Sequence, residues 1–161
     1  MTTSIVATVD PATNRVTARA DRGDAIRMDG ELPEGLAEVA GPKDAVLAAL
    51  AGCTGMDVAS ILRKKRQVPD AHEIVVSAES AEEHPRVFVS IRIEHRVSGA
   101  VGVEALRRAI ELSATRYCPV NAMLSQATRI EHHYRLTDGA GATTAALVAV
   151  TGPGGTADRA L

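Results

Sequence analysis

The two cysteines of this 161-residue chain are the side chains with the clearest chemical potential. Cys53 lies inside the apolar stretch LAALAGCTGMDVASILRKKRQ, next to Gly52 and two residues before Gly55. Each glycine weakens a helix by roughly 1 kcal/mol relative to alanine, so a purely structural helix has no reason to carry both. The alternative is that Cys53 is simply a small residue of the hydrophobic core, because free cysteines are often buried on apolar helix faces.

Cys118 has an equally particular setting, because it immediately precedes Pro119 in the segment RYCPVNAML. Proline is favoured at the first helical position, which predicts Cys118 at a helix N-cap, where free amides stabilise a thiolate. The alternative is that Cys118 simply fills the cap. One sulfur on each of two helices suggests a redox pair, in which one thiolate attacks and the other condenses with the sulfenic acid. The residues alone nominate Cys118 as the activated sulfur.

Asp57 is a third candidate, because it follows Cys53 by one helical turn and lies near the same face. A carboxylate beside an apolar stripe needs a partner. The neighbouring basic run, residues 63–66, has a simpler interpretation. Cations in the last turn of a helix are stabilised by the negative end of the helix dipole. The alternative is that these cations bind an anionic ligand or partner.

These side chains must be positioned by an alternation of strands and helices. Turn residues and period-two patterns predict a hairpin over 4–20 and a third strand over 25–30, and Pro42 opens a helix that reaches about residue 67. Further strands are expected at 73–80, 86–97, 128–136 and 145–150, with helical segments at 103–117 and from 119. This order predicts an α+β fold with an antiparallel sheet. We expect one domain over 1–137 and a Gly/Ala-rich, partly disordered extension over 138–161.

Composition and motifs exclude several function classes. The net charge is −2 and aromatic residues are 2%, so neither nucleic acid nor an anionic membrane is an expected partner. No signal peptide or run of 18 apolar residues is found, and the expected location is the cytoplasm. Neither a phosphate-binding loop nor a CxxC or HExxH motif is present, so no cofactor or metal is expected. His132 and His133 are adjacent and should point to opposite faces of a strand.

The segments GPKDAVLAALAGCTGMDVASILRKKRQ and AIELSATRYCPVNAML resemble the OsmC/Ohr family of osmotically inducible and organic-hydroperoxide-resistance proteins. The resemblance covers residues 5–137 and is greatest to the YhfA-like branch, whose members carry an MDG segment, a G-C-[ST]-x-x-D-V helix and an L-S-x-x-[KR]-Y-C segment. It implies an intertwined homodimer, with two central helices between antiparallel sheets from both chains. It also implies a thiol peroxidase in which Cys53 is peroxidatic and Cys118 resolving, which reverses the assignment made from the residues alone.

The chain departs from the pattern of the better-known hydroperoxidases of this family. Those proteins have an arginine before the first helix that holds the thiolate, and a glutamate after the helix-opening proline that holds the arginine. Here the loop 30–41 has no arginine, Asp44 is a shorter and shifted acidic residue, and Arg27 is the nearest upstream guanidinium. Asp57 is characteristic of the YhfA-like branch and would either pair with an arginine of either subunit or anchor the structure.

The resemblance therefore predicts a dimeric peroxidase that reduces organic hydroperoxides through a Cys53–Cys118 disulfide. By analogy with the family, a lipoyl-type dithiol would reopen that disulfide, and no metal or bound cofactor is implied. A softened helix at Cys53 would expose a local helix N-terminus to its sulfur. The absent loop arginine favours an alternative, a non-enzymatic dimer of the same fold that binds a small hydrophobic ligand. A thiol redox sensor is a third possibility.

Overall fold

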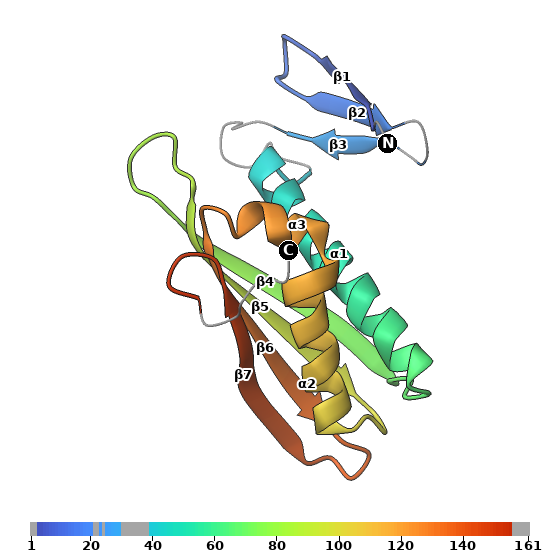
Figure 1. Cartoon of the computed structure of the whole chain (residues 1–161). Coiled ribbons are helices and arrows are strands. Elements are labelled where there is room, and N and C mark those ends of the chain that lie inside the picture. Colours follow the sequence, from blue (N-terminus) through green and yellow to red (C-terminus); the bar gives the residue numbers. More distant parts are fainter. Residues whose placement is uncertain (1–2, 21–22, 24, 30–38, 156–161) are drawn as a thin grey trace. The chain divides into compact units, whose positions relative to one another are not determined.

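The computed structural model describes residues 3–20, 23, 25–29 and 39–155, which include most of the predicted elements. The chain divides into two compact units, Met1–Ala48 and Ala49–Leu161. In the first unit, β1 (Ile5–Val9), β2 (Val16–Ala20) and β3 (Ile26–Met28) form an antiparallel sheet in the order β1–β2–β3 (Figure 1). The predicted hairpin and third strand are confirmed.

The MDG segment has a structural role within the first unit. Asp29 follows β3 and is buried, and its carboxylate lies 3.1 Å from the guanidinium of Arg15, directly before β2. A buried carboxylate needs such a partner, so this ion pair ties β3 to the preceding hairpin. Residues 30–38 of the loop that lacks the family's arginine lie outside the described residues.

Helix α1 (Pro42–Lys64) begins at the predicted proline and runs without interruption past Cys53. The local helix N-terminus expected at Cys53 is therefore absent, because the backbone hydrogen bonding of α1 continues there. Arg63 and Lys64 occupy its last turn, as the dipole argument predicts. Gly55 has a packing role, since a Cβ built on it would lie 2.7 Å from Cδ1 of Ile74.

By length and composition alone α1 could cross a membrane. In the structure, one face of the part of α1 that belongs to the second unit packs into the core of that unit. Val58 and Leu62 are fully buried and pack with Leu106, Ile110 and Tyr134 in one apolar cluster. A membrane-spanning role would leave this cluster without one of its walls.

The second unit contains a four-stranded sheet in the order β4–β5–β6–β7, formed by β4 (Ala71–Ser80), β5 (Phe88–Ser98), β6 (Arg129–Thr137) and β7 (Thr143–Thr151). The antiparallel prediction is wrong for one pair, because β5 and β6 run parallel. A parallel pair needs a long crossover, which the helices between these strands supply. The expected domain boundary at residue 137 falls between β6 and β7, which pair with each other in one sheet. Residues 156–161 of the expected C-terminal extension lie outside the described residues.

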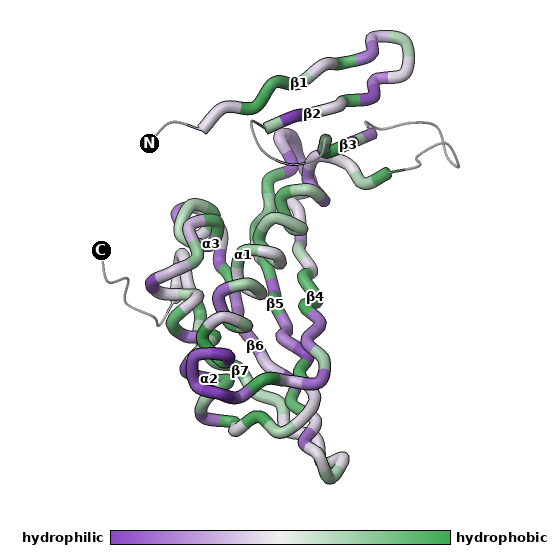
Figure 2. Tube along the Cα trace, turned by 90° about the vertical axis from the view of Figure 1, so that its right-hand side faces the viewer, coloured by the Kyte–Doolittle hydropathy of each residue, from purple (hydrophilic) through white to green (hydrophobic). Residues whose placement is uncertain are grey.

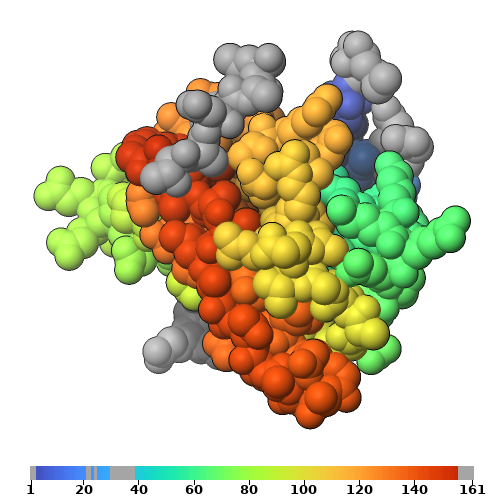
Figure 3. All heavy atoms as spheres, turned by 60° about the horizontal axis from the view of Figure 1, so that its bottom comes forward, coloured from blue at the N-terminus to red at the C-terminus, as the bar shows by residue number. Residues whose placement is uncertain are grey.

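That crossover consists of α2 (Val103–Leu112), the π-helical turn η1 (Ser113–Tyr117) and α3 (Pro119–Leu124). Figures 1 and 2 show α1 and α2 on the same face of the four-stranded sheet. In the space-filling view of Figure 3, the atoms of α2 lie between those of α1 and β7. The opposite face of the sheet carries charged pairs such as Arg96–Glu94 at 2.8 Å and Arg135–Glu94 at 3.3 Å. One face is thus a packed core that holds the cysteine-bearing elements.

Candidate thiol site

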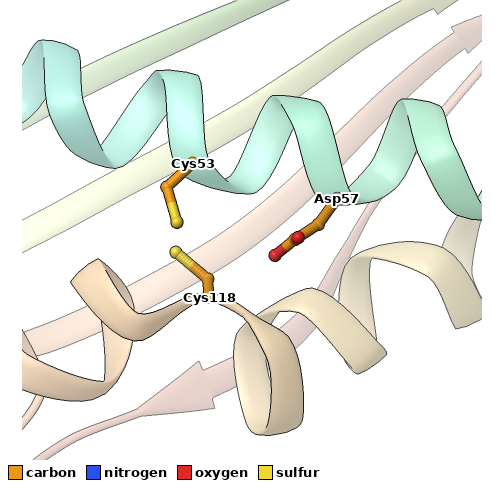
Figure 4. A group of neighbouring side chains, drawn as sticks. All are labelled: Cys53, Asp57 and Cys118. Atoms are coloured by element: carbon orange, nitrogen blue, oxygen red, sulfur yellow. The ribbon is translucent and has the colours of Figure 1, made fainter. Parts of the chain in front are cut away.

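Three predicted residues of the second unit come together between α1 and the η1–α3 junction. The sulfurs of Cys53 and Cys118 and a carboxylate oxygen of Asp57 all lie within 4.8 Å of one another. Figure 4 shows the three side chains pointing toward one another across the gap between the helices. Both cysteines are free thiols; Cys53 and Asp57 are half-buried, whereas Cys118 is 3% exposed.

The π-helical turn η1 positions Cys118. The Cys118 N–H donates to the carbonyl of Ser113 at 3.0 Å, five residues back, and this wider turn ends in the extended backbone of Cys118. Pro119 then starts α3, and the Sγ of Cys118 accepts from the N–H of Asn121 at 3.3 Å. The predicted N-cap position of Cys118 is confirmed.

The environment of Cys118 does not activate it. Burial raises the pKa of the Cys118 thiol from 9.0 to about 12, its hydrogen bond with Cys53 and the charge of Asp57 add to that rise, and only the Asn121 amide opposes it. The sequence-based expectation that Cys118 is a ready thiolate is therefore wrong. One amide at the end of a six-residue helix does not compensate for removing the sulfur from water.

Asp57 is held by a chain of buried polar side chains. Its Oδ2 accepts from the hydroxyl of Ser113 at 2.9 Å, and the Ser113 hydroxyl lies 3.0 Å from that of Thr54. Thr54 lies 3.3 Å from Nε2 of His95, whose Nδ1 lies 2.9 Å from Nε2 of His72. The chain connects the thiol site to β4 and β5.

In this series of hydrogen bonds, each side chain donates to the neighbour that is nearer to the carboxylate of Asp57. Ser113 has one hydroxyl hydrogen, and it donates this hydrogen to the carboxylate of Asp57. In the hydrogen bond between Ser113 and Thr54, the hydroxyl of Thr54 is therefore the donor. Thr54 must then accept from Nε2–H of His95, and the Nδ1 of His95 accepts from His72. Burial lowers the pKa of His95 to about 3, with the neighbouring His72 and His132 adding to the effect, which keeps His95 in the neutral form that this pattern requires.

A second polar chain starts at Cys118. Asn121 lies 3.4 Å from the hydroxyl of Thr151, and that hydroxyl lies 3.4 Å from Nε2 of His132, so both bonds are long. His132 is fully buried, and its Nδ1 is the buried side-chain nitrogen without a partner among the described residues. His133 faces the other way and lies 3.1 Å from Glu131, as strand alternation predicts.

A cavity of about 490 Å³ opens beside Asp57. Its apolar walls are formed by Ile61, Leu112 and Tyr117. Its polar lining includes Ser60, Lys64 at the end of α1 and Lys65 directly after it. The cavity is large enough for a small organic molecule to lie against the helices with one end near the thiol site.

Arg27 and Asp44 belong to the first unit and are not members of the three-residue group. Arg27 is exposed on β3, and Asp44 accepts from the N–H of Gly41 at 3.0 Å, which makes it a helix-capping residue. Thr54 and Ser113 were missed as site residues in the sequence. Their signal was present, since both hydroxyl positions belong to the cysteine motifs of the YhfA-like branch.

Comparisons with known proteins agree with this architecture. The family described as OsmC-like protein matches residues 35–133. Protein YhfA of Escherichia coli K12 is 38% identical over 115 residues, which cover 71% of this chain and 84% of that protein. A hypothetical protein from Aquifex aeolicus VF5 has a structure with a TM-score of 0.74 and 25% identity, over 86% of this chain and 98% of that one.

A more distant structure, from Legionella pneumophila, is described as the organic hydroperoxide resistance protein OsmC and a predicted redox protein. It shares the fold with a TM-score of 0.58 and 13% identity, over 82% of this chain and 95% of that one. The family match covers more than half of the chain, and the resemblance to YhfA-like proteins is confirmed by their sequence identity. The chain belongs to the OsmC-like protein family.

Proposed function

We propose that the protein is a thiol peroxidase that reduces small organic hydroperoxides with Cys53 and Cys118. The observation that carries the proposal is the pair of free thiols, one half-buried and one buried, whose sulfurs lie within 4.8 Å of each other and of a carboxylate oxygen of Asp57. Asp57 also lines a cavity large enough for a small organic molecule. Cys53 is the attacking sulfur, because a peroxide can reach a half-buried thiol more easily than the buried Cys118.

The cycle consumes one peroxide and two thiols. The Cys53 thiolate attacks the O–O bond, forms a sulfenic acid and releases an alkoxide, which takes up a proton and leaves as the alcohol. The sulfur of Cys118 then attacks the sulfenic sulfur, a disulfide forms, and water leaves. A disulfide has an S–S length of about 2.05 Å, so the sulfurs approach by less than about 2.8 Å. A dithiol reductant of lipoyl type would restore both thiols by exchange.

In this chain Asp57 would replace the missing arginine by a different chemistry. A carboxylate cannot stabilise a thiolate by charge, but it can accept the thiol proton and return it to the departing alkoxide. Ser113 fixes one carboxylate oxygen, which keeps Asp57 directed toward the sulfurs. The apolar walls formed by Ile61, Leu112 and Tyr117 would hold the organic group of the peroxide.

The homodimer and the cytoplasmic location also belong to this proposal. The exposed apolar residues Val6 on β1 and Met56 on α1, each 72% exposed, favour burial against a second copy of the chain. A reducing compartment would keep both thiols available between turnovers. Light scattering of the purified protein would give a mass twice that of the 16.8-kDa chain.

The decisive experiment mixes the reduced protein with cumene hydroperoxide in a stopped-flow instrument. Thiol loss should be faster than for free cysteine, and mass spectrometry should find a Cys53–Cys118 disulfide. In Cys118→Ser the sulfenic acid should accumulate on Cys53 and be trapped by dimedone. Cys53→Ser, the matched variant, should lose the fast reaction.

Two results would contradict the proposal. Dimedone labelling of Cys118 in Cys53→Ser, with none of Cys53 in Cys118→Ser, would reverse the two roles. Thiol loss no faster than that of free cysteine would exclude the peroxidase. The cavity beside Asp57 would then favour the second candidate, a dimer that binds a small hydrophobic ligand without chemistry.

A further inference from the structure

We propose that the reduced protein binds one thiophilic divalent metal ion, such as Zn²⁺, through Cys53, Asp57 and Cys118. Two sulfurs and one carboxylate oxygen converge from α1 and the η1–α3 junction, all within 4.8 Å of one another (Figure 4). Four-coordinate zinc has Zn–S bonds of about 2.3 Å and Zn–O bonds of about 2.0–2.2 Å, which separate its ligand atoms by roughly 3.5–3.8 Å. Side-chain adjustments of about 1 Å would reach that geometry.

The types of ligand select the metal. Thiolates bind soft and borderline ions such as Zn²⁺ and Co²⁺, whereas Mg²⁺ and Ca²⁺ require shells of oxygen ligands. Three protein ligands leave a fourth position for water, which is the arrangement of open zinc sites. The two thiolates and Asp57 carry three negative charges, which a divalent cation largely compensates. The partial burial of the group strengthens that attraction relative to water.

The surroundings already contain the contacts that support metal ligands. The hydroxyl of Ser113 donates to Oδ2 of Asp57 at 2.9 Å, so one carboxylate oxygen is fixed and the other remains to be offered. The N–H of Asn121 donates to the sulfur of Cys118 at 3.3 Å, a contact that a bound thiolate keeps. Thr54 supports Ser113 from the adjacent turn of α1.

Metal binding has consequences for the thiols. Cys118 must lose its proton when it becomes a ligand, so binding releases at least one proton and weakens as the pH falls. A sulfur bound to the metal has a lone pair committed to that bond, and a disulfide between Cys53 and Cys118 offers no thiolate. The metal-bound and disulfide states are therefore mutually exclusive.

Cobalt provides the test, because thiolate ligands give charge-transfer absorption in the near ultraviolet and a tetrahedral site gives intense visible bands. The reduced full-length protein is titrated with CoCl₂ without oxygen, and ZnCl₂ is then added to displace cobalt. We expect one Co²⁺ per chain, thiolate charge-transfer bands, and their loss on addition of Zn²⁺. Cys53→Ser and Cys118→Ser should each reduce the charge-transfer intensity by about half or lose binding altogether.

The carboxylate and its support are tested with matched variants. Asp57→Asn should weaken the affinity for Zn²⁺ by roughly a hundredfold, and Ser113→Ala by roughly tenfold. Glu104→Gln, which changes a 92%-exposed carboxylate on α2, should leave the affinity unchanged. Circular dichroism confirms that each variant folds. Blocking Cys53, the more exposed thiol of the unmutated protein, with methyl methanethiosulfonate should abolish the bands without any substitution.

Octahedral cobalt spectra without thiolate bands would overturn the metal site, as would an equal loss of affinity in Asp57→Asn and Glu104→Gln. Persistence of the bands in the thiol-blocked protein would overturn it as well. No peroxide enters this experiment, so its outcome is independent of peroxidase activity. A protein that binds cobalt but does not reduce peroxides, or one that reduces peroxides but does not bind cobalt, distinguishes the two proposals.

Discussion

At the scale of single residues, burial outweighs local backbone effects at Cys118. The residue occupies the predicted N-cap, with the Asn121 amide on its sulfur, yet the pKa of its thiol rises to about 12. Desolvation is the largest cause, because a thiolate loses more by leaving water than one amide returns. The consequence is an unreactive resting thiol at Cys118, which does not suit the residue that first attacks the peroxide.

Slow alkylation of Cys118 follows from this pKa. At pH 8 a thiol with a pKa of 12 has roughly a thousandfold less thiolate than one with a pKa of 9, so iodoacetamide should modify Cys118 about a thousandfold more slowly in the folded than in the urea-unfolded protein. Peptide mass spectrometry reads each cysteine separately. The folded rate should still rise about tenfold per pH unit between pH 8 and 10. A rate that levels off below pH 9 would show an ordinary thiol.

At the scale of elements, two irregular features of the helices position the site. The π-helical turn η1 directs both Ser113 and Cys118 toward α1, which a regular continuation of α2 would not do. On α1, the two glycines have different surroundings although they flank the same cysteine. A Cβ at Gly55 would meet Ile74 of β4, whereas a Cβ at Gly52 would meet nothing within 4 Å.

Alanine substitutions should separate these two glycines. Gly52→Ala should raise the free energy of unfolding by about 1 kcal/mol, because it gains helix propensity without a clash. Gly55→Ala should gain less or lose stability, since its methyl group displaces the end of Ile74. Urea unfolding of both variants measures the difference. Equal gains would show that Gly55 is not needed for packing, and a loss in Gly52→Ala would reveal a contact there, as a second copy of the chain would make.

At the scale of the whole molecule, the second unit buries two neutral histidines behind the thiol site. Burial lowers the pKa of His95 to about 3 and that of His132 to about 4, from an ordinary value of 6.5. Both side chains are fully buried between the sheet and the helices. In the unfolded chain they take up protons below pH 6.5, whereas in the folded chain they do so only near pH 3–4.

The free energy of unfolding should therefore already decrease between pH 7 and pH 5, before the carboxylates begin to take up protons. The contribution of both histidines is complete above pH 6.5 and is lost as the pH falls toward 3–4, with a slope of about 1.4 kcal/mol per pH unit for each. From pH 7 to pH 5 the free energy of unfolding should drop by about 3–4 kcal/mol. Urea unfolding at both pH values measures this drop.

Single substitutions assign the drop to its source. His95→Gln and His132→Gln should each remove about half of the pH dependence, whatever they do to the stability at pH 7. Comparison of the slopes, rather than of absolute stabilities, isolates the titration from lost packing. An unchanged slope in both variants would assign the acid sensitivity to other groups.

Several local features of the fold and of the thiol site could be predicted from the amino-acid sequence. Local patterns and turn residues predicted the hairpin, the start of α1 at Pro42, the strand and helix order, and Cys118 at an N-cap. The cysteine motifs identified the family and the two thiols. These features follow from interactions between residues that are close in the chain, where periodicity and propensity are informative.

The environment of the two thiols, in contrast, depends on how distant segments of the chain pack together. The parallel pairing of β5 with β6, the approach of Asp57 to both sulfurs, and the burial of Cys118 all depend on contacts between distant segments. The polar chain through Ser113, Thr54 and His95 crosses three elements in the same way. Desolvation and ligand geometry arise from the packing of such segments together, and so the pKa of Cys118 and the three-ligand group become visible only in the fold.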